Sequence, residues 1–194
     1  MTDPAADAPP ISRFPVPKLD ELPDDIRTMI ETVQEKSGFV PNVFLALANR
    51  PDEFRAFFAH HDALMDRSDG LSKAERELIV VATSARNECL YCVVAHGAIL
   101  RIRSKRPLLA DQVATNPWKA DLSERERLIV EFALRMVDDS ASVTDADLDA
   151  MRQHGFSDDE IWDIGAITAF FAQSNRLANL TSMRPNDEFY TMGR

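Results

Sequence analysis

Apolar residues recur at intervals of three and four positions along most of the chain, the spacing that gives a helix one apolar face. The clearest stripes contain Ile26, Met29, Ile30 and Val33; Leu78, Val81, Ala82 and Ala85; and Leu128, Ile129, Phe132, Ala133 and Met136. No stretch alternates between apolar and polar residues over the length of a strand bounded by turn residues. The chain is therefore predicted to be all-α, with eight or nine helices.

Several helix starts are marked by a Ser or Thr followed three positions later by an acidic residue, a pairing that satisfies free amide groups in the first turn. These starts lie at Ser72, Ser123, Thr144 and Ser157. The first of these helices is expected to end near Asn87, and the next to begin near Glu88 or Cys89. Other helices are predicted from 22–25 to Gly38, over 42–49, from Pro51 onwards and, as a short one, within 108–115. The last two are expected over 144–154 and from 157 to about 180.

Two of these segments resemble each other. Residues 71–82 and 122–133 share the sequence LS-x-x-E-R at their start and a similar apolar stripe, at an offset of 51 positions. Repetition of this kind predicts two related helical units. Only the first unit is followed by cysteines, so only the first is expected to carry thiol chemistry.

The candidate chemistry lies in and after the first unit. Cys89 and Cys92 form a C-x-x-C pair, His96 follows four positions after Cys92, and Glu77 lies twelve positions before Cys89. If a helix opens at Cys89, Cys92 and His96 lie on one face a turn apart, where a thiol and an imidazole can share a proton. This spacing predicts a reactive thiol.

At these residues the sequence resembles the alkyl hydroperoxide reductase D-like (AhpD-like) proteins of the carboxymuconolactone decarboxylase superfamily, whose motif is E-x11-C-x2-C-x3-H. Glu77, Cys89, Cys92 and His96 match every spacing, and the segments LSERERLIVEFA, HGFSDDEI and FFAQSNRLAN are also similar to its peroxidase-related branch. The resemblance covers roughly residues 15 to 190 and implies one AhpD-like helical fold. One position departs from it, because Tyr91 stands where the best-studied members have a histidine.

Composition narrows the class of protein further. With 194 residues, 45% of them hydrophobic, the chain can fill one core, which we expect to span residues 18–194. The proline-rich, acidic residues 1–17 are predicted to be an extended or disordered arm without the features of a secretory signal. The net charge of −10 argues against binding to nucleic acid or to an anionic membrane, and no apolar run suggests a membrane span. We expect a cytoplasmic protein in which two close cysteines indicate redox or metal chemistry.

Three hypotheses compete for the cysteine motif. In the first, the protein is a thiol-dependent peroxidase, in which one cysteine attacks a peroxide and the other resolves the sulfenic acid as a disulfide. In the second, Cys89, Cys92, His96 and Glu77 bind zinc, although three ligands on one helix converge poorly on a tetrahedral ion. In the third, the cysteines are small buried apolar residues of a non-catalytic, oligomeric interaction module. A lesser alternative is the lyase activity of the decarboxylase branch, which does not need a C-x-x-C pair.

The sequence leaves the attacking cysteine ambiguous. The positive end of a helix dipole favours Cys89, whereas hydrogen-bond reach to His96 favours Cys92. The resemblance implies that Cys92 is the peroxidatic and Cys89 the resolving cysteine. Glu77 is expected to orient His96 or to accept a proton through it.

Some other residues receive a structural interpretation. The stripe of Phe54, Phe57 and Phe58 is expected to be core, and the adjacent histidines 60 and 61 point about 100° apart, so they are no ready metal pair. Asn175 and Arg176 match an N-R pair of similar proteins, but we expect a loop cap and a partner of a surface acid.

The predicted partners follow from the peroxidase hypothesis and the resemblance. The substrate is a hydroperoxide, and the resemblance implies a dithiol reductant, such as a lipoylated or thioredoxin-like protein, and a homo-oligomer. The sequence has no haem, flavin or phosphate-binding motif, so no cofactor and no metal are predicted.

Overall fold

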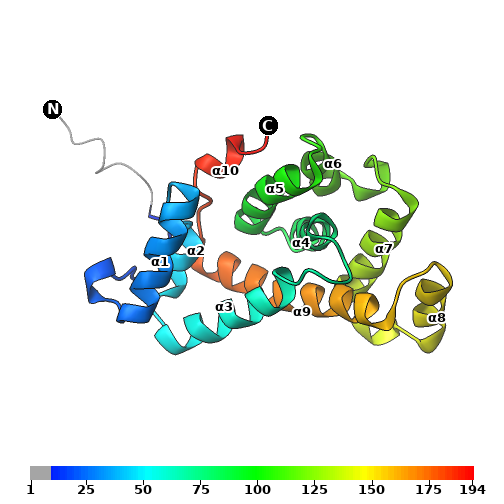
Figure 1. Cartoon of the computed structure of the whole chain (residues 1–194), viewed down its shortest axis with the longest axis horizontal. Coiled ribbons are helices and arrows are strands. Elements are labelled where there is room, and N and C mark those ends of the chain that lie inside the picture. Colours follow the sequence, from blue (N-terminus) through cyan, green and yellow to red (C-terminus); the bar gives the residue numbers. More distant parts are fainter. Residues whose placement is uncertain (1–9) are drawn as a thin grey trace.

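The computed structural model describes residues 10–194, which form ten α-helices and three short 3-10 segments, without a strand in that range (Figure 1). The α-helices are α1 (Asp24–Ser37), α2 (Asn42–Leu47), α3 (Pro51–Met65), α4 (Lys73–Arg86), α5 (Leu90–Ser104), α6 (Leu109–Thr115), α7 (Glu124–Asp139), α8 (Asp145–Gln153), α9 (Asp158–Thr181) and α10 (Glu188–Thr191). The all-α prediction is confirmed. The single turn α10 was not expected, because no sequence pattern predicted it.

The predicted helix starts are correct because the capping pairs form. At Ser72, Ser123 and Ser157 the serine hydroxyl accepts a hydrogen bond from the amide three residues later, and the glutamate there accepts one from the serine amide. Gly38 ends α1 with a φ of 84°, a left-handed conformation that glycine adopts without strain.

Helix α4 lies at the centre of the molecule, with α5, α6, α7 and α9 around it (Figure 1). Every residue of α4 from Arg76 to Ser84 is buried. Arg76 is fully buried because its guanidinium pairs with Asp163 of α9 at 2.8 Å and donates to main-chain carbonyls, among them that of Leu64. A helix buried on all sides fixes the positions of the side chains that it carries towards the site.

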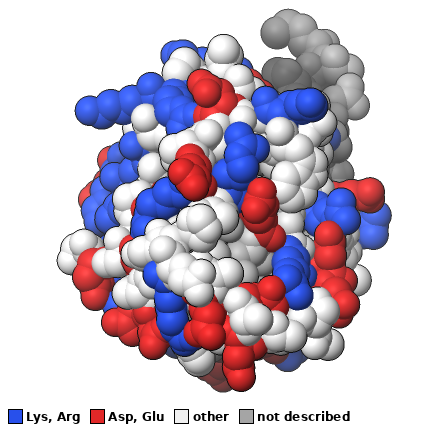
Figure 2. Space-filling view, turned by 90° about the vertical axis from the view of Figure 1, so that its right-hand side faces the viewer, with Lys and Arg blue, Asp and Glu red and all other residues white. Residues whose placement is uncertain are grey.

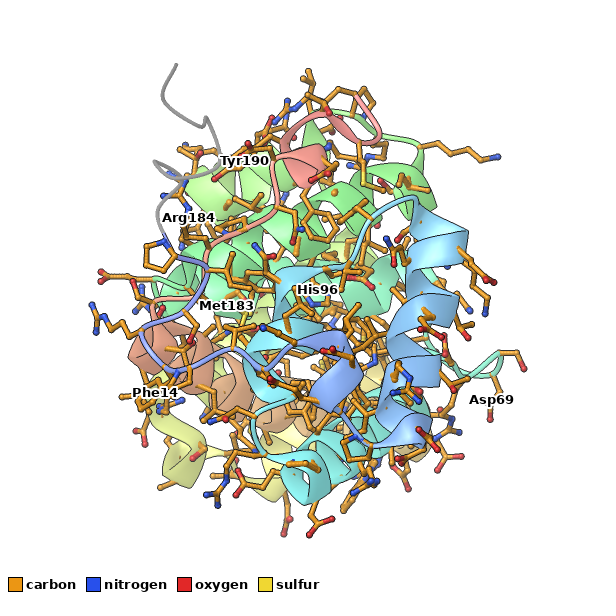
Figure 3. All side chains as sticks on the ribbon, turned by 90° about the vertical axis from the view of Figure 1, so that its left-hand side faces the viewer. Phe14, Asp69, His96, Met183, Arg184 and Tyr190 are labelled. Atoms are coloured by element: carbon orange, nitrogen blue, oxygen red, sulfur yellow. The ribbon has the colours of Figure 1, made fainter. Side chains whose placement is uncertain are left out.

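The described part of the predicted arm runs beside the C-terminal segment. The amide of Arg13 donates to the carbonyl of Thr181, and the amide of Arg184 donates to that of Ile11. In Figure 3, Phe14 and Arg184 lie towards the edge of the molecule, whereas His96 lies nearer its middle. The prediction for residues 1–9 lies outside the described part of the chain.

The surface carries charges of both signs. On the face at the right of Figure 1, basic and acidic side chains are interspersed rather than gathered into one basic patch (Figure 2). Over residues 10–194, no helix combines the length and the apolar character that crossing a membrane requires.

Candidate active site

The turn between α4 and α5 places the cysteine pair. Glu88 adopts a φ of 53°, which is uncommon for a residue other than glycine, and this reverses the chain so that the amide of Cys89 donates to the carbonyl of Ser84 at 2.9 Å. Cys89 becomes the N-cap of α5, and its carbonyl accepts the first helical hydrogen bond, from Val93. The predicted start of this helix is therefore correct to within one residue.

The two thiols are buried and act on each other. A hydrogen bond with Cys92 is the main cause that lowers the pKa of Cys89 from an ordinary value near 9 to about 7, and the main-chain amide of Cys92 and the side chain of Asn175 act in the same direction. The pKa of Cys92 is raised, first by the same contact with Cys89 and then by burial. Cys92 therefore holds its proton more tightly than Cys89 does, and Cys89 is the first of the two thiols to become a thiolate.

Glu77 and His96 meet beside this pair. The Nδ1 atom of His96 lies 2.7 Å from Oε2 of Glu77, and the imidazole contacts the ring edge of Phe171 with ring centroids 4.8 Å apart. Glu77 is buried, although a glutamate beside an arginine early in a helix is usually a surface acid. Because Nδ1 is engaged by the carboxylate, Nε2 is the ring atom through which His96 can exchange a proton.

Helix α9 supplies two further residues: Asn175, for which the sequence predicted a different role, and Ser174, which the sequence interpretation missed. Asn175 is fully buried, donates to Oγ of Ser84 at 2.9 Å, and accepts from the side chain of Asn87 at 2.9 Å. Its amide also lowers the pKa of both thiols. The Oγ atom of Ser174 lies 3.8 Å from Sγ of Cys92.

The expected roles of Asn175 and Arg176 are therefore wrong. Asn175 caps no loop, because it lies inside α9 and bridges that helix to the turn before Cys89. Arg176 is exposed and donates to the carbonyl of Ala172 in its own helix rather than to a surface acid. The N-R pair was the available sequence signal for Asn175, but no local pattern shows that α9 packs over the turn before Cys89.

Tyr91 takes a structural position. It is buried, and its hydroxyl accepts a hydrogen bond from the amide of Val43 at the start of α2 at 3.1 Å. Burial raises the pKa of the phenol, so it stays protonated at neutral pH. Tyr91 thus attaches α2 to α5.

The two adjacent histidines of α3 face different surroundings. His61 lies 2.9 Å from Asp62 and near the ring of Phe171, which also contacts His96, whereas His60 packs against Phe170. Within residues 10–194, no group of three or more His, Cys, Asp or Glu side chains is arranged to hold a metal ion. This arrangement gives the zinc hypothesis no support.

Comparison with known proteins places the chain among relatives. Residues 51–114 match the carboxymuconolactone decarboxylase family. The chain is 66% identical to an uncharacterized peroxidase-related protein from Ralstonia eutropha JMP134, whose crystal structure is described as an alkylhydroperoxidase AhpD core; the match covers 96% of this chain and 98% of the other, with a TM-score of 0.95. This chain belongs to the AhpD-like, peroxidase-related proteins of the carboxymuconolactone decarboxylase family.

Other solved structures are also similar to this AhpD-like protein. An uncharacterized peroxidase-related protein from Silicibacter sp. TM1040 is 40% identical over 97% of this chain and 98% of its own, with a TM-score of 0.91. The debrominase Bmp8 is 18% identical over 92% and 93% of the two chains, with a TM-score of 0.73, and shows a shared fold alone. No curated protein matches the chain.

Proposed function

We propose that this AhpD-like protein reduces hydroperoxides through a thiol–disulfide cycle at Cys89 and Cys92. The observation that carries this proposal is the buried pair at the start of α5, where Cys89 is the N-cap, Cys92 lies in the first turn, and the contact between them lowers the pKa of Cys89 to about 7. A thiolate is the nucleophilic form of cysteine, and a pKa near neutrality makes a large fraction of it available at neutral pH. Relatives described as peroxidase-related support the same class of activity.

The resemblance assigns the attack to Cys92, whereas the resting negative charge lies on Cys89, so attack by Cys92 requires a proton transfer between the two thiols. In the resting pair, the thiolate of Cys89 accepts the proton of Cys92, so that Cys92 carries the charge when it attacks the hydroperoxide. The O–O bond breaks, the sulfur becomes a sulfenic acid, and an alkoxide leaves. The thiol of Cys89 then attacks the sulfenic acid, which releases water and forms the disulfide.

Glu77 and His96 supply the remaining proton. The departing alkoxide needs one proton to become an alcohol, and a protonated His96 can donate it through Nε2. Glu77, 2.7 Å from Nδ1, stabilises the positive charge of that imidazolium and fixes the orientation of the ring. The overall reaction converts a hydroperoxide and two thiols into an alcohol, water and a disulfide.

Regeneration requires a second reactant. A dithiol reductant, such as a lipoylated or thioredoxin-like protein, would exchange with the disulfide and return both cysteines to thiols. A cytoplasmic location suits this cycle because the compartment keeps thiols reduced. Assembly as a homo-oligomer is part of the same proposal and follows from the resemblance.

The test is a free-thiol count on the purified protein before and after one equivalent of an organic hydroperoxide, followed by non-reducing peptide mapping. The proposal predicts that two thiols are lost together and that one peptide carries an intramolecular disulfide between Cys89 and Cys92. Unreacted thiols, or intermolecular disulfides alone, would contradict it. Metal analysis of the same sample tests the zinc hypothesis independently.

A further inference from the structure

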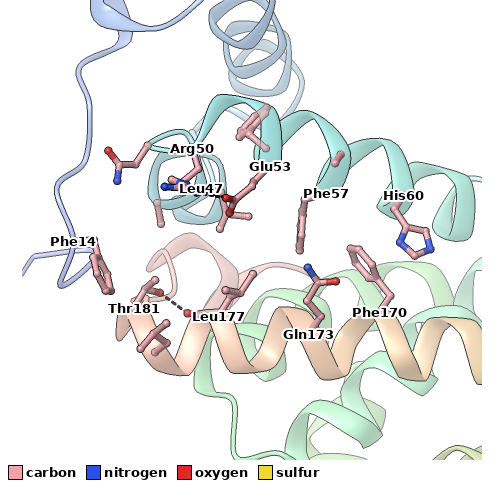
Figure 4. A pocket seen from close by; sticks show the side chains of 15 residues that line it. Phe14, Leu47, Arg50, Glu53, Phe57, His60, Phe170, Gln173, Leu177 and Thr181 are labelled. Carbon is pink, nitrogen blue, oxygen red and sulfur yellow. Dashed lines mark hydrogen bonds and ion pairs between the residues drawn. The ribbon is translucent and has the colours of Figure 1, made fainter.

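Helix α9 faces two different parts of the molecule. Its side chains that line a cleft towards α3 are Phe170, Gln173, Leu177, Leu180 and Thr181 (Figure 4). One position after each of the first three come Phe171, Ser174 and Ala178, which share the same helical spacing and are buried. Phe171 contacts His96, and the other two lie against the thiol pair. A distinct, buried face of α9 therefore covers the candidate active site.

The hydroxyl of Ser174 on this face has an unusual partner. A Ser or Thr inside a helix commonly donates to the carbonyl four residues before it. Thr168 and Thr181 of the same helix do so, and the bond from Thr181 to the carbonyl of Leu177, at 2.9 Å, is the dashed line in Figure 4. For Ser174, the partner among the described residues is Sγ of Cys92, at 3.8 Å. This hydroxyl is therefore aimed at a reacting sulfur.

The direction of this contact follows from the other thiol. The proton of Cys92 is directed towards Cys89, because the hydrogen bond between them is the main cause that lowers the pKa of Cys89 and raises that of Cys92. The sulfur of Cys92 has no second proton to give, so the hydroxyl of Ser174 is the donor. A charged acceptor forms a stronger hydrogen bond than a neutral one, and the contact therefore favours negative charge on Cys92.

The neighbouring residue Asn175 acts differently. Its amide lowers the pKa of both thiols, so it eases ionisation without choosing between Cys89 and Cys92. The charge of His96 lowers the pKa of Cys89, whereas the contact of Ser174 is with Cys92. The titratable groups around the pair are Glu77 on α4, Tyr91 and His96 on α5, and the exposed Glu88 of the turn.

We propose that Ser174 is a further catalytic residue, whose hydroxyl donates to the sulfur of Cys92 and so allows this thiol, rather than Cys89, to carry the charge when it attacks. The inference rests on the proposed function and assigns a residue to its first step. In that step one proton moves from Sγ of Cys92 to the thiolate of Cys89, while the hydroxyl of Ser174 keeps its own proton. Attack on the hydroperoxide then follows as described above, and no other reactant is needed.

The first test isolates Cys92 in the Cys89→Ser protein, where it is the only cysteine of the chain. Thiolate absorbance against pH gives its pKa without any peroxide. Adding Ser174→Ala is expected to raise this pKa by about one unit, because a donor to the thiolate is lost. Thr168→Val is the matched control, since it removes a buried hydroxyl of α9 that bonds to the main chain, and it should leave the pKa unchanged. An unchanged or lower pKa in Ser174→Ala would overturn the inference.

The second test uses the protein with both cysteines. In Ser174→Ala the pH at which the first thiolate forms should stay the same, because that charge lies on Cys89. The stopped-flow rate of the first oxidation by cumene hydroperoxide should nevertheless fall about threefold near pH 7. The share of charge on Cys92 falls about tenfold, and the greater nucleophilicity of a more basic sulfur offsets part of that loss. A shift of the first thiolate as well would show a general disturbance of the site and would overturn the inference.

Together the two tests separate this inference from the proposed function. If the wild-type protein consumes no peroxide but Ser174→Ala raises the pKa of Cys92, the proposed function fails and Ser174 stands as the donor to that thiolate. If peroxide is consumed and Ser174→Ala changes neither the pKa nor the rate, the inference fails and the proposed function stands.

Discussion

Helices α4 and α7 begin with the same capping pair, but only α4 is followed by cysteines. Both start with a serine and a glutamate in a reciprocal capping pair, at Ser72 and Ser123, 51 positions apart, and both bury an apolar stripe in the core. They also touch each other, because Arg125 of α7 pairs with Glu75 of α4 at 2.7 Å. The repeated signals therefore specify helix starts and core faces, which both units need.

The difference lies in four positions and in their surroundings. Adding 51 to 77, 89, 92 and 96 gives 128, 140, 143 and 147, and the second unit holds Leu128, Ser140, Val143 and Asp147 there. After α4 the chain turns through the left-handed Glu88 and delivers a cysteine to a helix N-terminus, whereas α7 runs on into a 3-10 segment at Ser140. The two units therefore share the residues that start the helix and form its buried face, and only the first unit also carries the reactive residues.

Replacement of the cysteines gives the largest expected effect. Cys92→Ser should abolish peroxide consumption. Cys89→Ser should stop repeated turnover but still permit one reaction that leaves a sulfenic acid on Cys92, more slowly at neutral pH because the proton acceptor is lost. Trapping of the sulfenic acid followed by peptide mapping measures both outcomes. Ser140→Ala, at the equivalent position of the second unit, is the control and should leave the activity unchanged. Detection of the sulfenic acid on Cys89 in Cys92→Ser would reverse the assignment.

Removal of the buried amide of Asn175 should have the next largest effect. Because this amide lowers the pKa of both thiols, Asn175→Ala should raise the pH at which the first thiolate forms. Each unit of that shift lowers the thiolate fraction about tenfold at pH values well below the pKa. Thiolate absorbance against pH gives the shift directly. Asn179→Ala is the matched control, because the side-chain amide of Asn179 also donates a hydrogen bond to Asn87, but to the main-chain carbonyl of that residue. An unchanged thiol pKa with a lower unfolding midpoint would show that Asn175 only supports the fold.

Glu77→Gln tests the proton path. The carboxylate holds His96 in place, and the charge of His96 is one cause that lowers the pKa of Cys89, so loss of the carboxylate should raise that pKa. The rate of the first thiol oxidation should therefore be reduced at about pH 6 to 7 and should approach the wild-type rate by about pH 9 to 10, where both proteins are thiolates. Stopped-flow oxidation across this range is the measurement, with Glu131→Gln on the exposed side of α7 as control. A deficit of constant size would mean that Glu77 positions His96 or assists the leaving oxygen instead.

The smallest expected effect concerns the serine caps with which α4 and α7 both begin. Ser72→Ala and Ser123→Ala each remove a cap that accepts one amide hydrogen bond, and each should lower the free energy of unfolding by about 1 kcal/mol. Neither should change the pH at which the thiolate forms. Urea unfolding of both variants measures the effect. A much larger loss for Ser72→Ala alone would show that the first helix start is specialised for the site rather than shared with the second.

Local signals were sufficient for the helices and for part of the site. Glu77 and His96 lie on consecutive helices joined by a tight turn, so their meeting followed from a capping pair, an expected helix end and a fixed spacing. Asn175 was misinterpreted because its contact with Asn87 joins positions 88 apart, and only the packing of α9 over the turn brings them together. Phe57 packs against the core as expected but is only partly buried, because periodicity shows which face of a helix is apolar and not how closely the opposite helix approaches.

The burial of the two thiols has a consequence for selectivity in a cell. Cys89 and Cys92 are only 1% and 2% exposed, although the pKa of Cys89 suits reaction at neutral pH. In this dithiol form, little of either sulfur is within reach of a bulky alkylating reagent. The thiols should therefore be alkylated slowly in the native dithiol protein and rapidly once the helices unfold.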